Sequence, residues 1–479
     1  MSAFVGLPTQ GRTSLRTRYP DIRFRAVFLR QGGSTIVAEA TSSGNKHNDV
    51  IQASTTKQIG NPMGVYSLTL VPRGHDYQNV ITPGDWCVIE ADNGAGLGWQ
   101  TVMYGPVSAI RKNVVVGQSG RTQTSVVVSG ADFGKPFLST SAFEDSLLAK
   151  DPAFSALSLA SISTQLSGLI GNPGEIVESV LSAYLNTGID QWVDPVTDKT
   201  FGTGWFQTDY IDKNLKGKTI ISSTFSLAGN LWQTLQQFQN PSINEMFVDF
   251  RPPYDDQNNI INLEPALVLR QYPFWGNDWN FLPGVVIDDD EIINDNTSKS
   301  DDDVKNWIRS VDDPSLTGSR AGIVPYLPIG LLNQNSIKRF GFRRLESPTQ
   351  YLLDPDTGKP IQDLVEDFTS LQALWHHSNE EFLAGNLTTY FRPDIRVGYR
   401  LTRRSPLSSS YMEYYVEGVQ HALNFPGQSS TVLTVTRGRD SNNELFQKSL
   451  EQLLDAGILE GIGTVSERIM SGILTGGLI

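Results

Sequence analysis

The sequence predicts an α+β protein, mainly β, with two tube-like antiparallel β-barrel domains, a mixed α+β insert and a C-terminal helical extension. Residues 61–137 contain short segments in which apolar and polar side chains alternate, and Gly- and Asn-rich turns separate these segments. Residues 393–440 carry a similar pattern. Between these regions, residues 139–280 change to helical spacing.

The first barrel is expected over residues 21–138, after a polar N-terminal arm formed by residues 1–20. The pattern predicts early strands at 23–30, 35–41 and 49–55, and further strands at 65–70, 86–91, 99–104, 107–116 and 124–129. We interpret the last five strands as a meander that rolls up and covers its own edges.

The α+β insert is expected over residues 139–280. Asn172 precedes Pro173 and Glu175, which is a typical helix start, and an apolar stripe follows over 176–185 until Gly188. Other helices are predicted at 141–150 and 226–239, and strands at 243–250 and 266–270. Residues 152–174 lack charge, but Ser residues interrupt them, so we do not expect a stable membrane insertion.

The second barrel is expected over residues 281–440, with an inserted helix at 360–383. The sequence pattern in the last part of this region repeats a pattern found in the first barrel. Residues 104–107 are followed by a strand that ends in Gly130 and Asp132, and residues 417–419 by one that ends in Gly438 and Asp440. The echo predicts two similar barrels in one chain, so that a trimer would present six of them.

Several motifs resemble chemical sites but lack the required spacing. A cluster of acidic residues between 288 and 303 lacks the spacing of a calcium loop, and we interpret it as an exposed loop. His376 and His377 precede Glu380 and Glu381 at i,i+4, which favours surface pairing over a metal site. The acidic residues are Asp288, Asp289, Asp290, Glu291, Asp295, Asp301, Asp302 and Asp303.

No catalytic motif emerges from the chain. Gly217-Lys218-Thr219 resembles the end of a phosphate loop, but Asp212 stands where that loop needs Gly. Carboxylate pairs for glycoside hydrolysis remain possible, because such partners can be remote in sequence. An aromatic group could stack a sugar, although a buried or interface patch is the favoured interpretation. This group comprises Tyr272, Phe274, Trp275 and Trp279.

Composition limits the possible functions. The net charge is -13, and an acidic chain is a poor candidate for gripping phosphate backbones. A single cysteine, Cys87, excludes an internal disulfide framework and suits a reducing cytoplasm. The first residues have no apolar core typical of a signal peptide.

Residues 441–479 carry an apolar stripe at helical spacing. This pattern predicts a C-terminal helical segment that docks onto a partner. The alternative is that this segment folds back on its own subunit. The candidate partner-docking residues are Leu445, Phe446, Leu450, Leu453, Leu454 and Ile458.

Five segments together resemble the baseplate hub proteins of tailed bacteriophages, a family that includes the hub half of type VI secretion spike proteins. In order they are VYSLTLVPRGHDYQNVITPGDW, PSINEMFVDFRPP with EPALVLRQYPF, NSIKRFGFRRLESPTQYL, and EGVQHALNFPGQSSTVLTVTRGRD. They span most of residues 60–440.

The resemblance implies a structural homotrimer that adapts a six-fold tail tube to a three-fold central spike. It would form part of the DNA-conducting channel, through which phage DNA passes without specific binding. The implied partners are the tail tube, central spike, tape measure and other baseplate proteins, in a virion assembled in the host cytoplasm. No cofactor, metal or catalytic activity is implied. The alternatives are a carbohydrate-binding or adhesin tail component and a hub with cell-wall hydrolase activity.

Overall fold

The computed structural model describes most of the chain, and several sequence predictions fall outside the described residues. These predictions are the arm at 1–20, nearly all of the helix at 141–150, most of 152–174, Gly188 and Trp275. The described residues are 21–30, 34–43, 48–73, 76–96, 98–116, 122–139, 141–142, 170–185, 208–215, 219–220, 229–239, 241–251, 264–274, 276–312, 330–349, 362–404, 411–442, 450–456 and 460–462.

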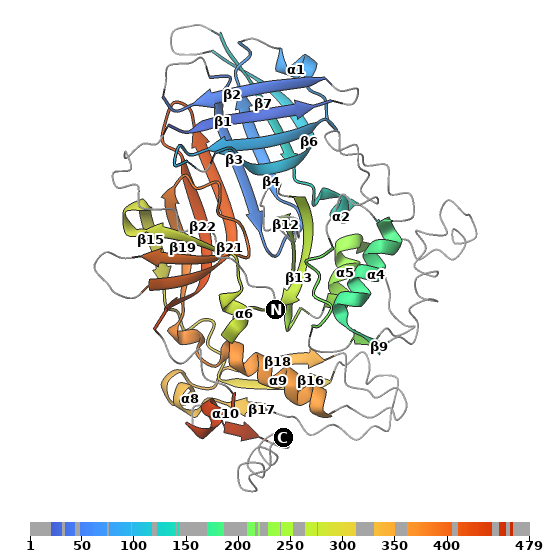
Figure 1. Cartoon of the computed structure of the whole chain (residues 1–479), viewed down its shortest axis with the longest axis vertical. Helices are drawn as coiled ribbons and strands as arrows, with labels where there is room; N and C mark the ends of the chain where they lie inside the picture. Colours follow the sequence, from blue (N-terminus) through green and yellow to red (C-terminus); the bar gives the residue numbers. More distant parts are fainter. Residues whose placement is uncertain are drawn as a thin grey trace, which may run out of the picture.

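The fold is mainly β, as the sequence predicts, and its largest element is a 13-stranded sheet (Figure 1). Seven of these strands come from the N-terminal part of the chain, and we call them the first β unit. They are β1 (Arg23–Leu29), β2 (Thr35–Thr41), β3 (Val50–Gln58), β4 (Val65–Leu70), β5 (Trp86–Asp92), β6 (Gln100–Val116) and β7 (Thr122–Ala131).

The predicted meander is wrong in its strand order. The strands lie in the order β4-β7-β6-β5, so β4 pairs with the last strand of the group instead of the next one. This is Greek-key connectivity. Alternating side chains specify which face of a strand is buried but not which strand lies beside it. The chain between β4 and β5, which includes helix α1 (Tyr77–Val80), makes the crossing.

The predicted break between strands at 99–104 and 107–116 is also absent. One strand, β6, runs through Pro106; its first part pairs with β5 as far as Pro106, and its second part pairs with β7 from Val107 onward. The register shifts between Val107 and Ala109, which marks a bulge. A bulge bends a strand without ending it, so β6 passes from one ladder to the next.

A second β unit repeats this order. Its strands are β14 (Gly284–Asp288), β15 (Ile292–Ser298), β19 (Leu383–Tyr390), β20 (Arg400–Arg404), β21 (Tyr411–Asn424) and β22 (Ser430–Asp440). The order β15-β19-β22-β21-β20 matches β3-β4-β7-β6-β5 strand for strand.

The two units differ at one edge. In the first unit β1 lies antiparallel to β5, with β2 beyond it, whereas in the second unit β14 lies directly against β20 and runs parallel to it. The second unit therefore has one strand fewer at this place. Among the described residues no ladder joins β2 to β3. Hydrogen bonds from Asp49 N–H to Glu39 O at 2.9 Å and between Thr41 and Asn48 at 3.0 Å link β2 to the residues just before β3. Closure of each unit into a barrel stays a prediction.

The two units are continuous with each other. β3 pairs antiparallel with β21, from Gln52↔Asn424 to Gln58↔Gly418. This ladder makes a single sheet of the two units, which lie beside each other in Figure 1.

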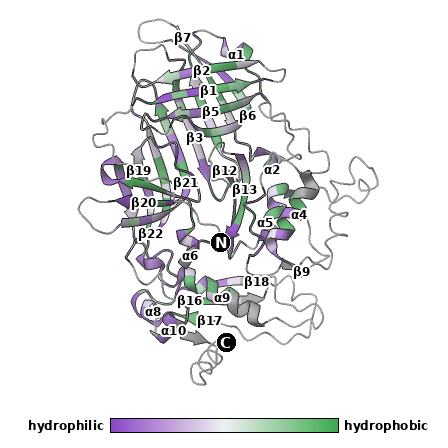
Figure 2. Cartoon of the chain, viewed as in Figure 1, coloured by the Kyte–Doolittle hydropathy of each residue, from purple (hydrophilic) through white to green (hydrophobic). Residues whose placement is uncertain are grey.

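Alternation along the strands produces the cores, and Figure 2 shows hydrophobic and hydrophilic residues alternating along the ribbons of the first unit. In β4, Tyr66, Leu68 and Leu70 are buried, while the residues between them are only partly buried. The second unit has its own cluster, which includes Ile287, Leu401, Leu433 and Val435. Burial of such side chains supplies about 1.5–3 kcal/mol each before entropy costs.

Helices and a hairpin from the predicted insert cover one side of the sheet (Figure 1). Helices α4 (Pro173–Leu185) and α5 (Leu231–Gln239) pack on strands β12 (Asn244–Arg251) and β13 (Glu264–Gln271) in one apolar cluster. Short elements accompany them: α2 (Lys135–Ser139), β8 (Ser141–Ala142), β9 (Ile170–Gly171), β10 (Thr219–Ile220), β11 (Gly229–Asn230) and α6 (Gly276–Asn280).

The structure confirms one predicted helix start and corrects another. The Asn172 side chain accepts a hydrogen bond from Gly174 N–H at 2.9 Å, so it caps α4. The helix predicted from Ser226 begins only at Leu231. There Asn230 and Gln233 exchange hydrogen bonds at 2.9 and 3.1 Å, which is a capping box that our sequence interpretation missed.

The insert within residues 281–440 is larger than the predicted helix. It contains β16 (Trp307–Asp312), β17 (Gly330–Leu332), α8 (Gln334–Phe340), β18 (Arg344–Thr349) and α9 (Gln362–His376). With β23 (Glu460–Ile462) the strands form a sheet in the order β18-β16-β17-β23. The helix predicted at 360–383 ends earlier than expected, at His376. The 3-10 turn η4 (Asn379–Glu381) and strand β19 follow it. No helix in the described part of the chain is long and apolar enough to span a membrane.

Candidate functional site

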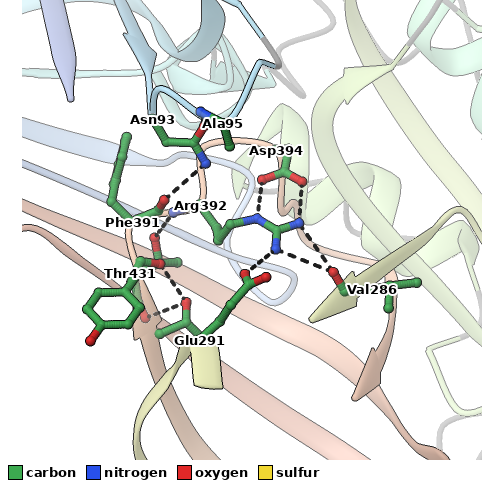
Figure 3. A network of polar contacts seen from close by, with 10 residues as sticks. Asn93, Ala95, Val286, Glu291, Phe391, Arg392, Asp394 and Thr431 are labelled. Carbon is green, nitrogen blue, oxygen red and sulfur yellow. Dashed lines mark hydrogen bonds and ion pairs between the residues drawn. The ribbon is translucent and has the colours of Figure 1, made fainter. Parts of the chain in front are cut away.

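The most elaborate polar arrangement lies where the two β units meet. Residues 391–397, which we call the junction segment, connect β19 to β20. Figure 3 shows this segment between the strands of both units. Phe391, Arg392, Ile395, Arg396 and Val397 are all buried.

Arg392 is the centre of this network (Figure 3). Its guanidinium donates two hydrogen bonds to the Asp394 carboxylate, both at 2.8 Å, and one to Glu291 at 2.6 Å. It also donates to Val286 O at 3.3 and 3.4 Å. Burial alone would raise the pKa of Asp394, but the Arg392 bonds and charge lower that pKa below its ordinary value.

The same segment contacts both β units. Arg392 N–H donates to Thr431 Oγ1 at 2.9 Å, and Thr431 Oγ1 lies 2.9 Å from His421 Nδ1 on β21. Phe391 O accepts a bond from the Asn93 side chain of the first unit at 3.4 Å. Arg396 also donates to Thr101 O on β6.

A small cavity of ≈ 30 Å³ lies under the junction segment. Charged groups of both signs line it: Lys57 with Asp132, and Arg396 with Asp249. Burial raises the pKa of Asp132, although the Lys57 ammonium opposes the rise. A polar pocket of this size can hold ordered water molecules.

Glu245 and Arg270 tie the insert to the second unit in the same way. Tyr415 OH on β21 donates to Glu245 Oε1 at 2.6 Å, and Arg270 donates to Glu245 at 2.6 Å and to Gly398 O at 2.9 Å. The hairpin β12–β13 is thus held against the strand that joins the two β units.

Paired charges of this kind position elements but do not provide an activated nucleophile. Burial raises the pKa of the Cys87 thiol well above its ordinary value, which disfavours the reactive thiolate. No group of three His, Cys, Asp or Glu side chains within the described ranges is placed to hold a metal ion. The arrangement is suited to fixing the relative position of the two β units.

The acidic residues predicted as an exposed loop are partly structural. Asp295 lies in strand β15, and Glu291 at the end of η3 (Asp289–Glu291) is buried against Arg392. Arg403 on β20 donates to Asp289 at 2.6 Å and to Asp295 at 2.5 Å. The loop interpretation missed these bonds because the arginines lie about a hundred residues further along the chain.

The aromatic patch is packing, not an open platform for a sugar. Phe274 and Trp279 are buried, and the Trp279 indole donates to Glu413 at 2.7 Å. Tyr272 stacks on Phe274 with ring centroids 5.3 Å apart, and Arg437 lies 4.5 Å over Phe274. The structure confirms the favoured interpretation for these rings.

The predicted surface pairs of His376 and His377 with glutamates are wrong. His377 is buried, and its Nδ1 lies 3.1 Å from Ala373 O and 3.0 Å from Leu374 O. Burial lowers the pKa of His376 to about 3 and that of His377 to about 4, so both rings are neutral at physiological pH. The end of α9 brings His377 inside, whereas His376 is only half-buried, with its Nδ1 3.1 Å from the Asn379 side chain. Helical spacing alone does not reveal this difference.

The candidate docking residues are only partly described. Leu445, Phe446 and Ile458 lie outside the described residues, and Leu450 begins helix α10 (Leu450–Asp455). Leu453 is fully buried and Leu454 half-buried. After α10, β23 pairs with β17 of the same chain. Docking of a partner on this segment stays a proposal.

Solved structures that resemble the chain include phage tail and type VI secretion proteins. A tail protein from Neisseria meningitidis MC58 matches at 12% identity and a TM-score of 0.48, over 88% of this chain and 98% of its own. The 43 kDa tail protein of prophage MuSo2 from Shewanella oneidensis matches at 11% and 0.48, over 87% and 98%. The E. coli c3393 protein, a component of the type VI secretion system, matches at 8% and 0.34, over 84% and 76%.

No protein-family model and no curated protein sequence matches the chain.

Proposed function

We propose that the protein is a structural hub of a phage tail baseplate. In this proposal three copies of the chain form a ring of six similar β units, which adapts the six-fold tail tube to the three-fold central spike. The ring surrounds part of the channel through which DNA leaves the tail.

The observation that carries the proposal is the repeated strand order. β3-β4-β7-β6-β5 and β15-β19-β22-β21-β20 share one topology, and the β3–β21 ladder joins them side by side. A chain that presents two similar units in one sheet can match a partner with twice its own rotational symmetry. The ordered sequence segments that resemble hub proteins support the same function.

The junction chemistry supports a structural role. Buried ion pairs at Arg392, Lys57 and Arg270 fix the segments that meet at the junction. Hydrogen bonds from Asn93 to Phe391 O, from Arg396 to Thr101 O and from Tyr415 to Glu245 cross between the two units and the insert, and a ring of repeated units needs such a fixed arrangement. The proposed partners are the tail tube, central spike, tape measure and other baseplate proteins. DNA passes without specific binding, and no enzymatic activity is part of the proposal.

The oligomeric state tests this function. Native mass spectrometry of the purified full-length chain is expected to give a species of three times the 52.8 kDa chain mass. Electron microscopy along the symmetry axis should then show six similar lobes. A chain that remains monomeric at every soluble concentration, or a ring without pseudo-six-fold order, would refute the proposal.

A further inference from the structure

We propose that adjacent subunits join by strand pairing between the β6 edge of one copy, residues 109–116, and the β15 edge of the next copy. The inference rests on the proposed ring and specifies how that ring closes. The two edges are complementary because the chain already contains the equivalent pair in its own β3–β21 ladder.

The β6 edge is the first half of the interface. β6 has β5 beside it only as far as Pro106, and from Ala109 to Val116 it pairs with β7 alone. Just before this edge, the turn at residues 84–85 lies against Val107, whose N–H donates a hydrogen bond to Asp85 O at 2.7 Å. Among the described residues, no strand lies against the other side of 109–116.

The β15 edge is the second half. β15 pairs with β19 and is the terminal strand of the 13-stranded path, so no further described strand lies beyond it. Its counterpart in the first unit, β3, has partners on both sides: β4 on one and β21 on the other.

The equivalence of strands between the two units indicates that the partner of each free edge is a second copy of this chain. β6 corresponds to β21 and β15 to β3, as their places in the two matching strand orders require. Within the chain, the β3 edge of the first unit meets the β21 edge of the second. The two corresponding edges that remain, β15 and β6, form the same kind of pair, but only between subunits. Such a head-to-tail contact closes into a ring when the rotation per unit divides a full turn.

Side chains at these edges support a protein partner. Val114 and Val116 on β6 are 56% and 69% exposed, and Ile293 on β15 is 41% exposed. Exposed edge strands with apolar side chains are uncommon in proteins that act as monomers, because they template aggregation.

The charges on the two edges are complementary. Arg111 and Lys112 are exposed near the start of the β6 edge, and antiparallel pairing of the β3–β21 kind places them opposite the C-terminal end of β15, where Asp301 and Asp302 are exposed just after the strand. Opposite charges across an interface favour the correct register and suppress the pairing of like edges. Pairing β6 with β6 of another copy would bring Arg111 and Lys112 of both copies together.

Disulfide trapping in the full-length protein tests the pairing. The chain has one cysteine, the buried Cys87, so background cross-linking is low. Val114→Cys is combined in turn with Ile293→Cys, Asn294→Cys or Asn296→Cys, which samples both faces of β15. In the correct register the Cβ atoms lie about 4 Å apart, and oxidation is expected to link subunits into covalent dimers and trimers. The matched control is Val114→Cys with Lys338→Cys on α8.

A charge swap supplies an independent measurement. Arg111→Glu with Lys112→Glu is expected to raise the dissociation constant of the assembly at least tenfold, and adding Asp301→Lys with Asp302→Lys is expected to restore it. Lys338→Glu with Arg339→Glu makes the same charge change on α8 and is expected to have no effect.

The outcomes separate this inference from the proposed function. If subunits form a trimer but no β6–β15 cysteine pair links them, the hub function stands and the edge pairing is wrong. If the protein is monomeric under all conditions, both fail. Linked trimers whose assembly responds to the charge swap and its rescue support both.

Discussion

Arg392 and Arg403 make similar contacts in different surroundings, and this difference predicts different costs of removal. Arg392 and Glu291 are each 9% exposed in their side chains, whereas Arg403, Asp289 and Asp295 are 22–30% exposed. Arg392→Met is expected to reduce the free energy of unfolding by about 3–5 kcal/mol, because it leaves buried carboxylates without their positively charged partner. Arg403→Met is the matched control and should cost about 1 kcal/mol or less. Urea unfolding of both variants measures the difference; equal losses would show that burial does not dominate.

His421 predicts how stability changes with pH. Burial, with a smaller contribution from the Arg396 charge, lowers the pKa of His421 to about 3, while Asp394 opposes the shift. The unfolded chain, with a His pKa near 6.5, therefore binds a proton that the folded chain does not. Stability contributed by this ring is complete above about pH 6.5 and falls as the pH drops below it.

The expected loss at pH 5.5 is about 1 kcal/mol for each buried histidine of this kind. His421→Leu should lower stability at pH 7 but flatten its decline between pH 7 and 5.5. Thermal unfolding of wild type and variant across this range is the measurement. An unchanged slope would mean that His421 binds protons equally in the folded and unfolded chains, so that its pKa is not lowered by folding.

At the scale of elements, two glycines allow strands to pack closely. A Cβ on Gly130 in β7 would clash with the Tyr66 ring and lie 2.5 Å from Pro106 O, and one on Gly438 in β22 would clash with the Tyr414 ring and lie 2.7 Å from Leu383 Cβ. Gly130→Ala and Gly438→Ala are each expected to cost about 1–3 kcal/mol through overpacking. Gly60 has no atom within 4 Å of such a Cβ, so Gly60→Ala should change the unfolding midpoint little. Equal effects at all three sites would contradict the packing argument.

The C-terminal segment allows fold-back and docking to be separated by residue. Leu453 is buried in its own chain, so Leu453→Ala should lower the melting temperature of the protein, at a cost of about 2–5 kcal/mol. Leu445→Ala with Phe446→Ala is expected instead to weaken attachment of one baseplate partner at an unchanged melting temperature. Deleting residues 441–479 should combine both effects and leave the two β units folded. If the deletion lowers only the melting temperature while every partner still binds, the docking proposal is wrong.

At the scale of the whole molecule, the net charge of -13 predicts a channel wall that is neutral or acidic in the assembled ring. Like charge allows DNA to slide without adhering. We expect the purified assembly not to retain double-stranded DNA in a mobility-shift assay at low salt, where electrostatic binding is strongest. Salt-sensitive retention, or a channel lined with Lys and Arg in a structure of the trimer, would contradict this prediction.

The sequence by itself determined the class of the fold and the positions of the strands in the first β unit and of β12 and β13. Alternation at 65–70 and at 35–41 predicted β4 and β2 with correct boundaries, and Asn172 with Pro173 predicted the start of α4. These signals are local, because burial of one strand face and capping of one helix end depend on residues a few positions apart. The echo between 104–132 and 417–440 also indicated a repeat, and the shared strand order agrees with it.

Only the tertiary structure decided which strands are neighbours, and with that the form of the candidate site. The β4–β7 pairing, the passage of β6 through Pro106 and the β3–β21 ladder each join segments that alternation cannot match to each other. Local sequence patterns likewise cannot show that Glu291 pairs with Arg392, or that His377 is buried under the end of α9. Pairing energy depends on what lies across the ladder or the core, and that partner can be hundreds of residues distant in the chain.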